Sequence, residues 1–150
     1  MMKYHLHPTL LCAALASLML GGCAINQPTA QVLHVRITEE TEQGTRMELA
    51  VQLDNPNDFA LPLPSASYTI RIADAGVFTF TDIPTTTLPA HGSQTLVFPA
   101  AFAHTGSLSG SNYSASGHIL YRPLGQFRAL LSQYKIPLPS AGFTATGQLQ

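Results

Sequence analysis

Apolar and polar residues alternate strictly on both sides of a turn-rich centre between Met47 and Ile72. Before the centre, every second residue from Met47 to Leu53 is apolar, and after it the same holds from Ala66 to Ile72. Alternation with a period of two places one face of each run toward a core, so both runs predict β-strands. The centre, residues 54–64, has the sequence DNPNDFALPLP, whose Asn, Asp and Pro residues favour turns. We interpret it as a connection between two strands.

The same alternation, over shorter runs, predicts further strands along the chain. These segments are residues 32–38, 77–81, 94–102, 117–122, 134–138 and 142–149. The turn-forming sequence Asp74-Ala75-Gly76 predicts a hairpin between 66–73 and 77–81. Pro99 has no backbone N–H, so its run is predicted to be an edge strand or to carry a bulge.

Two segments do not alternate. Residues 104–116 are small and polar and predict a loop. Residues 125–133 fit one or two helical turns, and a short strand fits them too. No repeat and no internal domain boundary is visible, so one domain is expected.

Composition places this domain in the all-β class. Of the 150 residues, 45% are hydrophobic and only 10% are charged, the reverse of what a disordered chain shows. Thr, Ser, Gly and Pro are abundant, which favours many short strands in an antiparallel sandwich or barrel. The charged residues are scattered and sum to −1 at neutral pH. Without a basic stripe, we expect no nucleic-acid partner.

The first 23 residues predict an export signal and a lipid anchor. Lys3 precedes an apolar run, Leu10 to Leu20, of the length of a signal peptide's hydrophobic region and too short to span a bilayer. The run ends in Leu20-Gly21-Gly22-Cys23, which resembles the lipobox of bacterial lipoproteins. The resemblance implies cleavage before Cys23 and acylation of the Cys23 sulfur. An ordinary secretory signal with an incidental cysteine is the alternative.

The cysteine count agrees with acylation. Cys12 lies in the predicted signal, so Cys23 is alone in the mature chain and has no intramolecular disulfide partner. Ala24 follows the cysteine, and by analogy with bacteria that have two membranes this favours the outer membrane, facing the periplasm. We therefore divide the chain into a lipoprotein signal peptide (1–22), a lipidated tether (23–31) and a folded domain (32–149).

The domain resembles one family along its whole length. The sequence around Asn55-Pro56-Asn57, then Leu61-Pro62, then Tyr68, is similar to the first half of the LEA type 2 domain, also called the water-stress and hypersensitive-response domain. Pro89 and Gly92 fall in a segment that resembles its second signature. The resemblance implies an immunoglobulin- or fibronectin-III-like antiparallel β-sandwich of about seven strands. It also implies a role in desiccation or envelope stress, no enzymatic activity, and an architectural role for the matched residues.

The side chains that carry chemistry form no recognisable site in the sequence. Asp54 and Asp58 offer oxygen ligands of the kind that calcium takes, but their spacing matches no calcium loop. Residues 106–110 resemble a nucleophile elbow only superficially, because Leu108 stands where the serine would be. The histidines beyond the signal show no metal-ligand spacing; they are His34, His91, His104 and His118. We expect no catalytic residue, no metal and no cofactor, so an enzyme is not predicted.

Two functions follow from these features. The first is a membrane-anchored, non-catalytic LEA type 2 lipoprotein that protects the envelope during desiccation or other stress. The alternative is a structural component of the envelope that binds lipids or a partner, motivated by Pro99 and the apolar residues 98–102 around it. The expected partners are the membrane, through the lipid on Cys23, and lipids or partially unfolded envelope proteins. The oligomeric state and the specific ligand stay open at this point.

Overall fold

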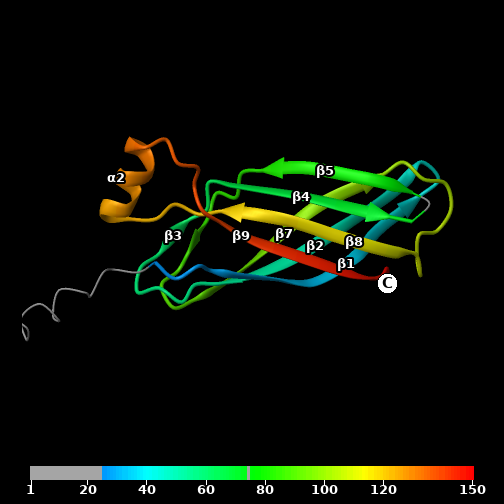
Figure 1. Cartoon of the computed structure of the whole chain (residues 1–150). Coiled ribbons are helices and arrows are strands. Elements are labelled where there is room, and N and C mark those ends of the chain that lie inside the picture. Colours follow the sequence, from blue (N-terminus) through cyan, green and yellow to red (C-terminus); the bar gives the residue numbers. More distant parts are fainter. Residues whose placement is uncertain (1–24, 74) are drawn as a thin grey trace, which may run out of the picture.

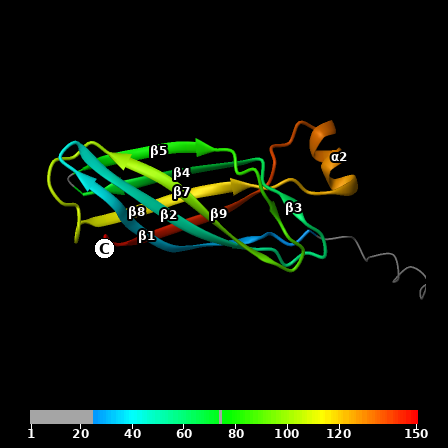
Figure 2. The same ribbon diagram turned by 180° about the vertical axis from the view of Figure 1, so that it is seen from behind.

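The computed structural model of the protein describes residues 25–73 and 75–150 and consists of two facing sheets (Figure 1, Figure 2). One sheet has the order β1-β2-β7 and the other β5-β4-β8-β9, with all neighbouring strands antiparallel. Their bounds are β1 Thr29–Thr41, β2 Gly44–Asp54, β4 Ser65–Ile72, β5 Gly76–Asp82, β7 Ser93–Phe102, β8 Asn112–Leu120 and β9 Ser140–Gln148. In the described residues, three strands thus face four, which confirms the predicted all-β sandwich.

The connection at residues 54–64 crosses from one sheet to the other. β2 ends at Asp54 in the first sheet, and β4 begins at Ser65 in the second. Between them, β3 (Leu61–Pro62) pairs with β6 (Thr87–Leu88) and closes this end of the sandwich. Leu61 and Leu88 are fully buried there, because the two short strands cover the end of the core.

The core forms where the alternating apolar residues of both sheets meet. Tyr68 of β4 and Phe98 of β7 lie at its centre, with ring centroids 4.9 Å apart. Leu49 of β2 and Ile70 of β4 are fully buried beside them. Each such side chain contributes roughly 1.5–3 kcal/mol when it leaves water, so the alternating pattern is the main source of stability.

The two open sides of the sandwich differ. On one side β1 lies beside β9, and the backbone N–H of Ile37 donates to the carbonyl of Gln150 across this junction. On the other side β5 and β7 are the edges of their sheets, which confirms the edge position predicted from Pro99. Pro99 pairs with Glu48 in an unbroken register, so β7 carries no bulge at this position. The Tyr68 hydroxyl of the opposite sheet donates to the Pro99 carbonyl.

Three sequence predictions need correction. β1 begins at Thr29, so residues 29–31 of the predicted tether are already strand, paired with β2. β8 begins at Asn112, because residues 112–116 find partners in β9 and shorten the predicted 104–116 loop. Residues 134–138 form no strand, since Lys135 has a φ of 53° and no strand in the described ranges pairs with them.

Residues 125–133, for which the sequence allowed either helical turns or a short strand, are helical. They form the helix α2 (Gly125–Gln133), which lies in the connection between β8 and β9. The predicted signal peptide and Cys23 lie outside the described residues. Among the residues that are described, no helix is long and apolar enough to cross a membrane.

Candidate functional site

Two buried asparagines form a corner where β2 leaves its sheet. The side chain of Asn55 donates to the carbonyls of Phe59 (2.8 Å) and Pro89 (2.9 Å) and accepts from the backbone and side chain of Asn57 (3.1 and 2.8 Å). Both asparagines are at most 4% exposed, so every amide group needs a partner inside the protein. A shorter or apolar side chain at either position would leave these groups unpaired.

The asparagine corner also holds the beginning of the described chain. The Asn57 side chain accepts from the backbone N–H of Asn26 (2.9 Å) and donates to the carbonyl of Asn26 (2.8 Å). The Gln27 side chain donates to the carbonyl of Ser140 at the start of β9 (2.9 Å). The segment before β1 is therefore fixed to the end of the sandwich, three residues after Cys23. The sequence pattern showed no sign of this contact, because Asn26 has no partner nearby in the chain.

The other residues of the family motif lie around this corner or in the core. The backbone N–H of Asn55 donates to the carbonyl of Gly92 (2.9 Å), and Gly92 packs against Pro89, where a Cβ would lie 2.5 Å from the proline ring. Tyr68 lies apart from them, in the middle of the core. Pro56 is exposed on the turn, and Leu61 and Pro62 form β3. These positions build the fold and present no reactive group to solvent.

The outward side of the four-stranded sheet is rich in hydroxyl groups, and we call it the hydroxyl face. The alternate residues of β4, β8 and β9 that do not enter the core are mostly Ser and Thr. Cross-strand pairs connect Ser67 with Thr81 (2.9 Å) and Thr69 with Thr79 (3.0 Å). Further hydroxyls lie in register on the next strands, at Ser114, Ser116, Thr144 and Thr146. In the sequence these residues appear only as the polar positions of each alternating run. The pairing register of the strands places them beside one another in rows.

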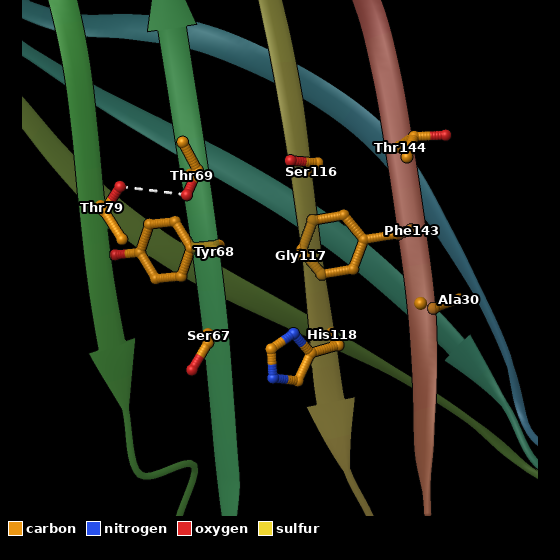
Figure 3. A pocket seen from close by; sticks show the side chains of 11 residues that line it. Ala30, Ser67, Tyr68, Thr69, Thr79, Ser116, Gly117, His118, Phe143 and Thr144 are labelled. Atoms are coloured by element: carbon orange, nitrogen blue, oxygen red, sulfur yellow. Dashed lines mark hydrogen bonds between the residues drawn. The ribbon is translucent and has the colours of Figure 1, made fainter.

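A shallow hollow of about 710 Å³ lies in the middle of the hydroxyl face. Figure 3 shows the hydroxyls of Ser67, Thr69 and Ser116 and the imidazole of His118 around it, on adjacent strands. Its floor is Gly117, where a Cβ would lie 2.5 Å from both the Phe143 ring and the Ser67 carbonyl. Hydroxyls both donate and accept hydrogen bonds, so this surface suits polar, uncharged groups.

An apolar groove of about 500 Å³, here called the edge groove, follows the open side between β5 and β7. Phe78 and Phe80 of β5 form one wall, and Pro99 and Ala101 of β7 contribute to the other. Phe80 is 46% exposed, although its side chain lies on the side of β5 that faces the core. Of the residues that motivated the lipid-binding alternative, Pro99, Ala100 and Ala101 line the groove, whereas Phe98 and Phe102 are buried in the core.

Several ionisable groups form pairs on the surface. Glu48 lies 3.2 Å from the His34 imidazole and 2.6 Å from the Arg36 guanidinium. The hydrogen bond from His34, aided by Arg36, lowers the pKa of Glu48 below its ordinary value. His91 and Asp58 form a second pair at 2.6 Å. Within residues 25–73 and 75–150, no three His, Cys, Asp or Glu side chains lie close enough to hold a metal ion.

Comparison with known proteins gives the same fold. The model of the LEA_2 family, described as late embryogenesis abundant protein, matches residues 50–138. A solved structure of a putative late embryogenesis abundant protein superposes with a TM-score of 0.62 at 17% identity, over 93% of this chain and 80% of the other. A protein from Arabidopsis thaliana superposes with a TM-score of 0.53 at 15% identity, over 85% of this chain and 83% of the other. At these identities the likeness to solved structures shows the fold alone. No curated protein matches the sequence significantly.

Proposed function

The chain belongs to the LEA_2 family of late embryogenesis abundant proteins, and from that premise we propose that it is a non-catalytic protein, anchored by lipid on Cys23, that protects the envelope during drying. Membership in the family makes it a stress-related protein. The anchor is supported by the lipobox-like sequence before Cys23. Two or more acyl chains on this residue hold a protein on a membrane stably, whereas one chain binds only reversibly.

The hydroxyl face is the observation that carries the protective role. As water is removed, lipid head groups and protein surfaces lose hydrogen-bond partners. Rows of Ser and Thr hydroxyls on a rigid sheet replace those partners without requiring the protein to rearrange. Only Arg71 and His118 are ionisable among the outward residues of β4, β5, β8 and β9. The face therefore binds polar surfaces of many kinds weakly, as protection of many molecules requires.

Drying of vesicles tests this role. Mature protein reconstituted through its lipid should reduce the leakage of a trapped dye after drying and rehydration. Replacement of three hydroxyls by near-isosteric Val should remove most of the protection; the residues are Thr69, Thr79 and Thr144. A matched triple replacement on the opposite sheet should retain it; the residues are Thr29, Thr38 and Thr95, all exposed. Equal leakage with both variants would exclude the hydroxyl face.

A genetic test addresses the physiological role. Deletion of the gene should reduce survival after desiccation or osmotic shock, and the wild-type gene should restore it. Unchanged survival of the deletion strain would contradict the proposed function.

The edge groove favours a second candidate function, the binding of an acyl chain. Its volume lies in the range of small-molecule sites, and its Phe, Pro and Ala side chains offer an apolar wall. Saturable binding of the fluorescent fatty acid cis-parinaric acid would support this function. Ala101→Trp should fill the groove and abolish binding, while Ala103→Trp, exposed but outside the groove, should not. Absence of saturable binding to the wild type would exclude it.

A further inference from the structure

The connection between β8 and β9 carries an exposed apolar surface on helix α2. Phe127 and Leu130 of the helix and Tyr134, its C-cap residue, follow one another at spacings of three and four residues, which places them along one side of the helix and its C-terminal end. Their exposed fractions are 44%, 48% and 65%. Before and after the helix, Leu124 and Ile136 are also about half exposed. Together these exposed side chains form what we call the α2 patch.

The charges near the α2 patch are all positive along the sequence. Arg122, Arg128 and Lys135 lie in this segment, and no acidic residue occurs after Asp82. The carboxylates concentrate elsewhere; Glu39, Glu40 and Glu42 lie at the turn between β1 and β2. That turn is at the far end of β1, which extends over 13 residues, or about 40 Å. The α2 connection is therefore cationic and apolar, whereas the β1–β2 turn at the opposite end of the sandwich is acidic.

Helix α2 and the first described residues share one end of the sandwich (Figure 1). The hydrogen bond from Gln27 to Ser140 joins the start of the described chain to the point where the α2 connection returns to β9. The backbone N–H of Arg122 donates to the carbonyl of Pro62 in β3, which fixes the other base of the connection to the same end. Asp54, Asp58 and Asp82 also lie toward this end, and Asp58 is paired with His91.

The distance from Cys23 to this end is short. Asn26 is held by Asn57, and three residues of extended chain reach about 11 Å at most. A lipid on Cys23 therefore keeps the α2 end of the sandwich within about 11 Å of the lipid head groups.

We propose that α2 is a second membrane contact, which inserts Phe127, Leu130 and Tyr134 into the interface of an anionic bilayer. The inference rests on the proposed lipid anchor, because the anchor supplies the proximity. A helix of nine residues is about 14 Å long and lies along the interface with its apolar side toward the acyl chains. Arg128 and Lys135 face the phosphate groups, and Tyr134 places a ring with a polar tip at the boundary. With two contacts the sandwich has a fixed orientation, with the acidic β1–β2 turn away from the membrane.

Tryptophan fluorescence tests the contact, because the chain contains no Trp. Mature lipoprotein carrying Phe127→Trp is reconstituted into vesicles of phosphatidylglycerol and phosphatidylethanolamine with brominated acyl chains. Val77→Trp is the matched control, since Val77 is 50% exposed and lies at the start of β5, at the opposite end. We expect at least threefold stronger quenching of the indole at position 127 than at position 77. Adding Leu130→Glu to the first variant should reduce its quenching to the level of the control.

The outcomes separate the two proposals. Equal quenching at the two positions overturns the membrane contact, as does a blue-shifted but unquenched indole at position 127, which would indicate packing against protein. The mass of the same preparation reports the lipid on Cys23. If Cys23 carries none, the anchor is wrong. The thiol is then coupled to a maleimide-bearing lipid, and the quenching comparison is repeated to decide whether α2 contacts the bilayer when held near it.

Discussion

Substitution Asn55→Ala tests the asparagine corner. The change removes an amide that donates two hydrogen bonds and accepts two, at donor–acceptor distances between 2.8 and 3.1 Å. Asn57 loses the acceptor for its backbone N–H and one partner of its side chain. Since Asn57 also holds Asn26, the loss extends to the segment before β1.

The magnitude follows from the number of bonds and their burial. A net contribution of about 1 kcal/mol per hydrogen bond, with buried groups left unpaired, gives a loss of about 3 to 5 kcal/mol in the free energy of unfolding. This is a large part of the roughly 5 to 15 kcal/mol typical of a whole domain. At about 4 °C per kcal/mol, the melting temperature should fall by about 15 °C.

Urea unfolding of the protein, followed by far-ultraviolet circular dichroism, measures the change. Asn112→Ala is the control, because Asn112 is exposed on β8, and we expect it to change the free energy by less than about 0.5 kcal/mol. If Asn55→Ala costs less than about 1 kcal/mol, the corner does not hold the β2–β3 connection, the Pro89 loop and the N-terminal segment as described.

Three further substitutions test particular contacts in the same unfolding assay. Thr45→Val should stabilise the protein by about 1 kcal/mol, because the buried Thr45 hydroxyl has no hydrogen-bond partner among the residues that the structure describes; a loss of stability would show that it has one. Gly117→Ala should cost about 1 to 3 kcal/mol, because its Cβ would collide with Phe143 and a backbone carbonyl, and a neutral result would refute this packing. Burial, with a smaller effect of Asp82, raises the pKa of Tyr68 to about 12 from 10.0. The unfolded chain therefore releases this proton first, and stability should fall as the pH rises from the unfolded pKa toward the folded one. Tyr68→Phe should flatten this slope, and an unchanged slope would assign it to another group.

The strands were predictable because burial on one face leaves a period of two in the sequence. The runs from Met47 to Leu53 and from Ala66 to Ile72 showed it, and both became central strands. Pro99 predicted an edge because a residue without an N–H is tolerated where no neighbouring strand needs that donor. The segment 134–138 also alternates, but within the described part of the chain no strand pairs with it. A local sequence pattern does not show whether another strand will pair with the segment.

The candidate sites were less accessible to sequence reasoning. The motif residues Asn55 and Asn57 were identified by resemblance, but the contact of Asn57 with Asn26 joins positions 31 residues apart and left no local signal. The hydroxyl face was visible as polar positions, and its rows depend on strand register. The edge groove could not be predicted because it depends on which strands lie at the edges of the two sheets. The α2 patch could not be predicted because it depends on the helix lying at the same end of the sandwich as the first described residues.

The mass of the mature protein purified from envelope membranes is the decisive measurement. In our proposal a lipid on Cys23 brings one defined end of the sandwich to the membrane, and both the protective role and the α2 contact depend on it. We expect a chain that begins at Cys23 and carries a diacylglyceryl group on the sulfur and an acyl group on the new amino terminus. A chain with a free Cys23 thiol, recovered in the water-soluble fraction, would contradict the lipid anchor and the membrane orientation that depends on it.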